Sequence, residues 1–149
     1  LMNEGQDFLE SFGNDQYTKL FDKKENIELI RNSMFASTNE IRGTSYSSRI
    51  EDPKYQFAGK TGTSQVKRIT EAERELDLAT KDIDYKNRDH ALFIAFGPFK
   101  NPRYALSIVI EHGGSGSSVA APLAKELFKL IIDRHDLREQ AQTQKIINT

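Results

Sequence analysis

The stretch HALFIAFGPFKNPRYALSIVIEHGG, residues 90–114, decides the fold. Its first part, residues 90–97, is an almost continuous apolar run that ends at Gly-Pro, and such a run predicts a strand buried on both faces. A turn at residues 98–102 separates this run from a second predicted strand at residues 103–111. Because a short turn joins them, the two strands should form an antiparallel hairpin.

Two further elements are expected before this hairpin. The segment YQFAGKTGTSQV, residues 55–66, follows Pro53 and is rich in aromatic residues, Thr and Val, so it predicts another strand. Further upstream the spacing predicts a helix over residues 25–42, with Gly43 as its stop signal. The apolar residues of its expected inner face are Ile27, Ile30, Met34 and Ile41.

After the hairpin, the glycine-rich segment 112–118 predicts a connector from strand to helix. A second helix is expected over residues 119–134, with Pro122 in its first turn, where a missing N–H costs little. The apolar face expected to cover the sheet consists of Leu123, Leu127, Leu130 and Ile131. The polar tail at residues 138–143 is expected to fray.

Residues 68–90 are strongly charged, and Thr70 with Glu73 has the spacing of a capping box for a short helix. We interpret this segment as a solvated surface excursion.

The whole order is helix, strand, charged excursion, strand, turn, strand, glycine connector, helix. The predicted fold class is therefore α+β, a small antiparallel sheet covered by helices.

Composition narrows the possible functions. The chain has 149 residues, 29% of them charged, with a formal net charge of −1, which suits one globular domain or part of one. No basic cluster accompanies this balance, so nucleic acid is not an expected partner. The absence of cysteine excludes disulfides and thiolate metal sites but leaves the cellular compartment open. The opening residues Leu1–Glu4 have no signal-peptide features, so we expect a boundary inside a longer gene product.

The tetrad Lys60-Thr61-Gly62-Thr63 within the predicted strand 55–66 carries the chemistry. Lysine supplies a positive charge, the threonines supply hydroxyl donors, and glycine lets a ligand backbone approach closely. This combination suits a carboxylate-bearing peptide laid along a strand edge. The triplet Lys60-Thr61-Gly62 alone also fits an ordinary glycine-containing strand.

Three blocks in order extend the tetrad into a family resemblance. FAGKTGTSQV at 57–66, HALFIAFGP at 90–98 with Asn101-Pro102, and VIEHGGSG at 109–116 resemble the closing strands of class B penicillin-binding proteins of the PBP2 type. The resemblance covers about residues 25–134. It implies that residues 1–149 are the C-terminal part of a transpeptidase (penicillin-binding) domain, which crosslinks peptidoglycan stem peptides through a serine acyl-enzyme and is blocked by β-lactams.

The resemblance also implies a role for each residue of the tetrad. Lys60 would complement the terminal carboxylate of the substrate and contact a serine of a second motif, and the hydroxyls of Thr61 and Thr63 would bind that carboxylate. The backbone N–H of Thr63 would form half of an oxyanion hole, while Gly62 keeps the strand edge open. No cofactor is implied. The nucleophilic serine is expected upstream of this chain, so the fragment alone should be inactive.

Implied partners are peptidoglycan stem peptides, β-lactams and membrane proteins of the elongation machinery. The implied location is the periplasmic face of the bacterial inner membrane, with an anchor upstream of this chain. Since part of a domain exposes the core face that its other part would cover, we also expect self-association into a homo-oligomer.

Several competing motifs are weak. Ser64 with Lys67 matches S-x-x-K, but Ser64 continues the K-T-G strand instead of starting a helix. Ser37-Thr38-Asn39 matches S-x-N but falls inside the predicted helix. A P-loop would need glycine where Lys54 stands, and a dinucleotide fingerprint would need glycine where Val119 stands.

The histidines His90, His112 and His135 lack metal-ligand spacing, so no zinc site is expected. The alternative functions are a non-catalytic module that binds peptidoglycan peptides or partner proteins at the same strand edge, and a nucleotide-binding domain that uses the glycine connector.

Overall fold

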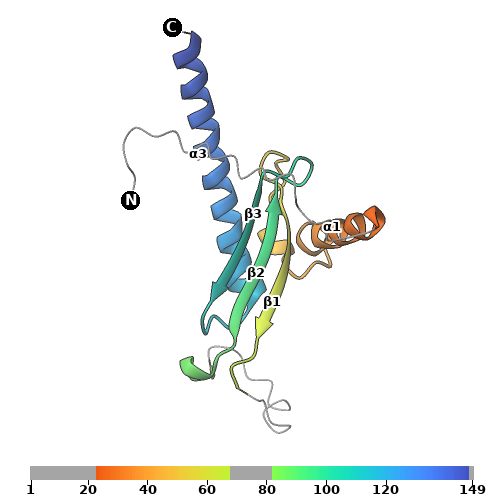
Figure 1. Cartoon of the computed structure of the whole chain (residues 1–149). Coiled ribbons are helices and arrows are strands. Elements are labelled where there is room, and N and C mark those ends of the chain that lie inside the picture. Colours follow the sequence, from red (N-terminus) through yellow and green to blue (C-terminus); the bar gives the residue numbers. More distant parts are fainter. Residues whose placement is uncertain (1–22, 68–81, 148–149) are drawn as a thin grey trace.

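The computed structural model describes residues 23–67 and 82–147. Its helices and strands form an α+β arrangement in which helices lie against a small antiparallel sheet, as predicted (Figure 1). The regular elements are α1 (Lys24–Asn39), β1 (Ala58–Ser64), β2 (His90–Gly97), β3 (Tyr104–Ile110) and α3 (Ala121–Ile147). Short helical turns are η1 (Tyr46–Ser48), η3 (Tyr85–Asn87) and the π-helical η4 (Gly116–Ala120).

The sheet has the order β1-β2-β3 with both pairs antiparallel, which confirms the hairpin. The prediction that β2 is buried on both faces is wrong. Ala91, Phe93 and Ala95 are buried on one face, whereas Ile94 on the other face is 51% exposed. In the described part of the chain α3 covers one face of the sheet only, so the alternate apolar residues of β2 on the other face are less buried.

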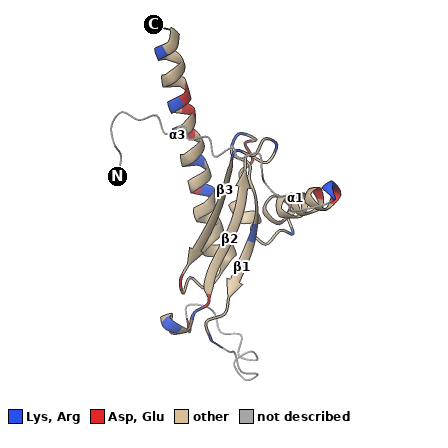
Figure 2. Cartoon of the chain, in the orientation of Figure 1, with Lys and Arg blue, Asp and Glu red and all other residues tan. Residues whose placement is uncertain are grey.

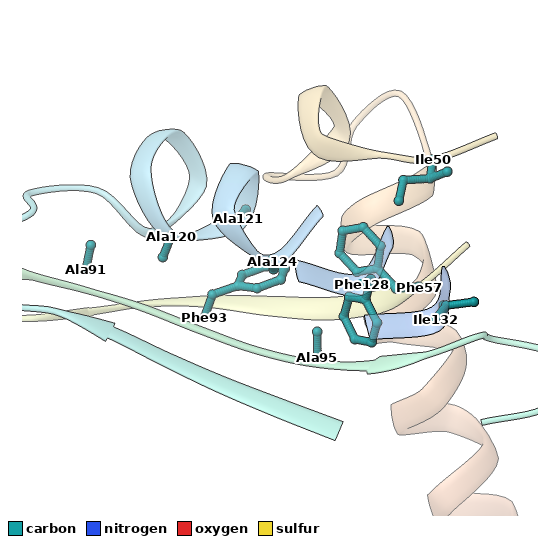
Figure 3. Packing of buried hydrophobic residues seen from close by; sticks show 10 residues of the cluster. All are labelled: Ile50, Phe57, Ala91, Phe93, Ala95, Ala120, Ala121, Ala124, Phe128 and Ile132. Atoms are coloured by element: carbon teal, nitrogen blue, oxygen red, sulfur yellow. The ribbon is translucent and has the colours of Figure 1, made fainter. Parts of the chain in front are cut away.

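Helix α3 covers the face of the sheet that carries Ala91, Phe93 and Ala95 (Figures 1 and 3). The ring of Phe128 stacks on that of Phe57 with a centroid distance of 5.0 Å. The rings of Phe57 and Phe93 form a T-shaped pair with a centroid distance of 6.2 Å. Small alanines bring the helix backbone close to the strands, which is why the contact is tight. The buried residues of α3 are Ala121, Ala124, Phe128 and Ile132.

The predicted inner face of this helix is therefore wrong. Leu123 is 47% exposed and Leu130 is 64% exposed, and Leu127 is also exposed, while Ile131 is only partly buried. The leucines are typical core residues by size, but the side next to the sheet accommodates alanines better because the backbones approach closely. The helix also continues to Ile147, so the polar tail at 138–143 is helical instead of frayed.

Helix α1 lies beside β1, away from α3 (Figure 1). Its existence was predicted, but it ends at Asn39, so Ile41 lies outside it. Its expected apolar face is wrong too, because Ile27 and Ile30 are exposed and the buried residue of the helix is Thr38. Its aromatic contact is made by Phe35, whose ring lies 4.3 Å from that of Phe99.

A polar network fastens α3 to the loop before β1. Lys54 Nζ lies 2.9 Å from Asp133 Oδ1 and 3.0 Å from Asp136 Oδ2, and the Tyr55 hydroxyl donates to Asp133 Oδ1 at 2.6 Å. The Tyr55 hydrogen bond, followed by that of Lys54, lowers the pKa of Asp133 below 3.8. Hydrogen bonds to Tyr55 and both aspartates raise the pKa of Lys54 above its ordinary value.

Charged residues otherwise lie on helices and connecting segments, and the sheet is almost free of them (Figure 2). Within the three described strands, Lys60 is the only Lys, Arg, Asp or Glu. The predicted capping box of Thr70 and Glu73 falls outside the described residues. Of the charged segment 68–90, the structure describes the part from Asp82, which includes η3.

Candidate active site

The tetrad Lys60–Thr63 lies in the middle of β1, which is an edge strand in the described part of the sheet. The Gly59 N–H donates to the Thr38 hydroxyl at 3.0 Å, so the backbone of Gly59 faces away from β2. In an antiparallel pair, alternate residues direct their backbone groups toward the partner strand and away from it. The N–H and C=O groups of Thr61 and Thr63 therefore face the same outer edge as those of Gly59.

Helix α1 closes the beginning of this edge. Asn39 Nδ2 donates to the Phe57 carbonyl at 2.9 Å, and the Thr38 hydroxyl accepts a hydrogen bond from the Gly59 N–H at 3.0 Å. These side chains satisfy the backbone groups that another strand would otherwise use. The edge that remains for an incoming strand therefore starts at Thr61.

The side chains of the tetrad divide between the two faces of the sheet. Lys60 pairs across the sheet with Ile94, on the face away from α3, and its Nζ reaches back to donate to the Thr61 carbonyl at 2.8 Å. Thr61 pairs with Phe93, on the face that carries the core. A positive charge and a threonine hydroxyl thus meet where the open edge begins.

Two hydroxyls to which the sequence assigns no role in the site continue from Thr61. Thr44 Oγ1 lies 3.3 Å from Thr61 Oγ1 and 3.3 Å from Ser37 Oγ. No sequence spacing announces this contact, because Thr44 precedes the strand by a turn and a loop. The chain of three hydroxyls, Ser37, Thr44 and Thr61, is hereafter the hydroxyl row.

The glycine connector packs against the tetrad. A Cβ atom on Gly116 would lie 2.5 Å from the Leu92 carbonyl oxygen and 2.7 Å from the Gly62 carbonyl oxygen, so only glycine fits there. The sequence predicts only a connector here, and its packing against the backbone of β1 follows from the structure. Ser115, the residue before this turn, accepts a hydrogen bond from the Ser118 N–H.

The competing motifs have the structural roles that were expected. Ser64 is the last residue of β1, and the residues after it up to Lys67 are not helical, so no S-x-x-K helix starts there. Ser37, Thr38 and Asn39 lie in α1, where the last two bind the edge of β1.

The histidines make structural contacts. The His112 N–H donates to His90 Nδ1 at 2.9 Å, and His135 Nδ1 lies 2.8 Å from the Tyr104 hydroxyl. In residues 23–67 and 82–147, no group of three or more His, Cys, Asp or Glu side chains is arranged to hold a metal ion. The same ranges contain no helix that is long and apolar enough to span a bilayer.

Comparison with known proteins identifies the family of this chain. A sequence profile described as the penicillin binding protein transpeptidase domain matches residues 2–129. The chain belongs to this family of transpeptidase domains.

Within the family, the chain is of the PBP2 (MrdA) type. The peptidoglycan D,D-transpeptidase MrdA of Salmonella typhimurium is 35% identical over 105 residues, which cover 70% of this chain and 16% of that protein. The chain thus spans only a small share of this relative's length.

Two solved structures are similar in sequence and in fold. PBP2 of Pseudomonas aeruginosa, solved in complex with WCK 5153, gives a TM-score of 0.57 at 31% identity, covering 74% of this chain and 20% of that one. PBP2 of Helicobacter pylori, solved in complex with MreC, gives a TM-score of 0.54 at 34% identity, covering 71% and 18%.

Proposed function

We propose that this chain supplies the substrate-binding strand of a peptidoglycan D,D-transpeptidase, within a longer protein that is here called the parent protein. The observation that carries the proposal is the open edge of β1, where the backbone of Thr61 and Thr63 faces outward next to the charge of Lys60. The parent protein would crosslink stem peptides through a serine acyl-enzyme and would react with β-lactams.

The geometry favours one direction for a bound peptide. A peptide that adds to β1 in the antiparallel sense has its C-terminal end toward Lys60, where α1 closes the edge. Its terminal carboxylate then meets the Lys60 ammonium and the Thr61 hydroxyl. In the parallel sense the carboxylate would lie toward Ser64, away from the only charge in the three described strands. We therefore infer antiparallel binding.

The remaining roles follow from this placement. The outward N–H of Thr63 is positioned to donate to the oxyanion that forms when the nucleophile attacks the peptide carbonyl, and the Thr63 hydroxyl adds a second donor to the carboxylate. Gly62, held against Gly116, keeps the strand flat and its edge accessible. Lys60 acts as an electrostatic anchor, with its Nζ already held at the Thr61 carbonyl.

The nucleophilic serine and its activating lysine are proposed to lie in the parent protein upstream of Leu1. Residues 1–149 would then be the C-terminal part of the transpeptidase domain, and the parent protein would act at the periplasmic face of the inner membrane. Its proposed partners are proteins of the elongation machinery, because a similar PBP2 was solved as a complex with MreC.

Intact mass spectrometry tests the proposal. The parent protein is incubated with benzylpenicillin, and the acylated peptide is mapped. A single adduct on a serine upstream of Leu1 is the expected result. A folded parent protein without an adduct would contradict the enzyme and favour the non-catalytic peptide-binding module.

A further inference from the structure

The hydroxyl row joins the end of α1 to the open edge of β1. Thr44 Oγ1 lies 3.3 Å from both Ser37 Oγ and Thr61 Oγ1, so it stands between a helix residue and a residue of the tetrad. Each hydroxyl has one hydrogen to donate and two lone pairs to accept with. The hydrogen of Thr61 can therefore point to Thr44 or outward to a ligand, but not to both.

We propose that Thr44 is a positioning residue that directs the Thr61 hydroxyl toward the carboxylate of the ligand. This inference rests on the proposed function. When Thr61 donates to an anion, it can still accept a hydrogen bond, and Thr44 is the neighbouring hydroxyl in reach. Thr44 then donates to Thr61 and accepts from Ser37, so the whole row points the same way. Aligned hydroxyls polarise one another and strengthen the final hydrogen bond to the anion.

The surroundings hold Thr44 in place for this role. The Gly43 N–H donates to the Glu40 carbonyl at 2.8 Å, and the Ser45 N–H donates to the Ser37 carbonyl at 3.0 Å, so both neighbours of Thr44 are fixed. A Cβ atom on Gly43 would lie 2.3 Å from the Ser37 carbonyl oxygen, so this turn presses against α1 as only glycine allows. Ser45 is fully buried, whereas Thr44 is exposed.

A purely structural role for Thr44 predicts something different. If the row only tied α1 to β1, its loss would affect every ligand equally and would show mainly as lower stability. If Thr44 orients Thr61 toward a carboxylate, its loss affects only ligands that carry the carboxylate. The comparison of benzylpenicillin with its methyl ester separates these cases, because the two probes differ only at that group.

The experiment measures second-order acylation rate constants of the parent protein with both probes. Thr44→Val removes the hydroxyl with little change in shape. We expect its rate with benzylpenicillin to fall about two- to tenfold, the effect of one net hydrogen bond, while the rate with the methyl ester stays unchanged. Thr44→Ser keeps the hydroxyl and should restore the wild-type ratio of the two rates.

Two further variants serve as an independent test and as a matched control. Ser37→Ala interrupts the row one hydroxyl earlier and should lower the same ratio by a smaller factor. Thr143→Val makes the matched change on the exposed part of α3, where Thr143 donates to the Glu139 carbonyl, and should leave both rates unchanged. Melting temperatures of all variants show whether each is folded.

An equal fall with both probes for Thr44→Val, or no fall with either, would overturn the positioning role. So would a ratio that Thr44→Ser fails to restore. A wild-type parent protein that reacts with neither probe would instead contradict the proposed function, so the two failures are distinguishable.

Discussion

The two helices contact the sheet in opposite ways. The centre of the α3 contact is apolar: α3 covers one face with alanines and with Phe128, whose ring stacks on that of Phe57. Helix α1 instead reaches the edge of β1 with Thr38 and Asn39, whose polar atoms bind backbone groups of the strand. The first contact stabilises the fold, whereas the second decides which part of an edge stays available to a ligand. Stability and the proposed substrate recognition thus depend on different parts of the same sheet.

The largest effect is expected when the apolar contact between Phe128 and Phe57 is removed. Phe128→Ala in the parent protein should lower the free energy of unfolding by about 3–5 kcal/mol, because the cavity would be surrounded by fully buried neighbours. Denaturant unfolding measures the change. Leu130→Ala on the same helix is the matched control and should cost under about 0.5 kcal/mol, since that side chain is exposed. Similar losses for the two variants would refute the face assigned to α3.

The next effect concerns the open edge and not the fold. Lys60→Ala should slow acylation by benzylpenicillin about 10- to 100-fold, the effect of losing a charged hydrogen-bond partner, and should leave the melting temperature nearly unchanged. Lys100→Ala, which removes an exposed lysine from the turn after β2, is the control. An unchanged acylation rate for Lys60→Ala would contradict the role of Lys60 as an electrostatic anchor.

A smaller effect is expected where α1 closes the edge. Thr38→Val leaves the Gly59 N–H buried without its acceptor, which should cost about 1–3 kcal/mol of stability. Amide hydrogen exchange of the parent protein should show faster exchange at Gly59, with protection at Phe93 in β2 kept. Protection at Gly59 that survives the substitution would mean that the hydroxyl does not close this edge.

The smallest effect should appear only in acid. Because the Tyr55 hydroxyl and Lys54 lower the pKa of Asp133, this carboxylate stabilises the fold above its ordinary pKa of 3.8. The contribution is lost as pH falls through the lower pKa of the folded state. Asp133→Asn should therefore flatten the acid side of a plot of melting temperature against pH. The matched substitution Asp52→Asn serves as control, and identical slopes in wild type and Asp133→Asn would contradict the network.

The order of elements could be read from the sequence because local signals define it. The apolar runs and the Gly-Pro step predicted β2 within its observed bounds and β3 within one residue at each end. The inner face of α3 could not be read in this way. Large leucines look like core residues in a helical pattern, yet the close approach of helix and sheet buries alanines instead.

The candidate site was predictable in its residues but not in its geometry. Lys60–Thr63 could be named from residue types and order. Which of these residues face outward depends on the pairing of β1 with β2, and on a hydroxyl of Thr38 that lies 21 positions before Gly59. The contact between Gly116 and Gly62 is equally long-range. Such contacts arise only when distant segments pack, so no local pattern announces them.

The most direct test of the central claim, that the open edge of β1 binds the reacting group, is a crystal structure of the parent protein acylated by benzylpenicillin. We predict that the acyl carbonyl oxygen lies about 2.7–3.1 Å from the backbone nitrogen of Thr63. The penicillin carboxylate should contact the Thr61 hydroxyl beside Lys60. An acyl carbonyl turned away from β1, with the carboxylate distant from Thr61, would contradict the account.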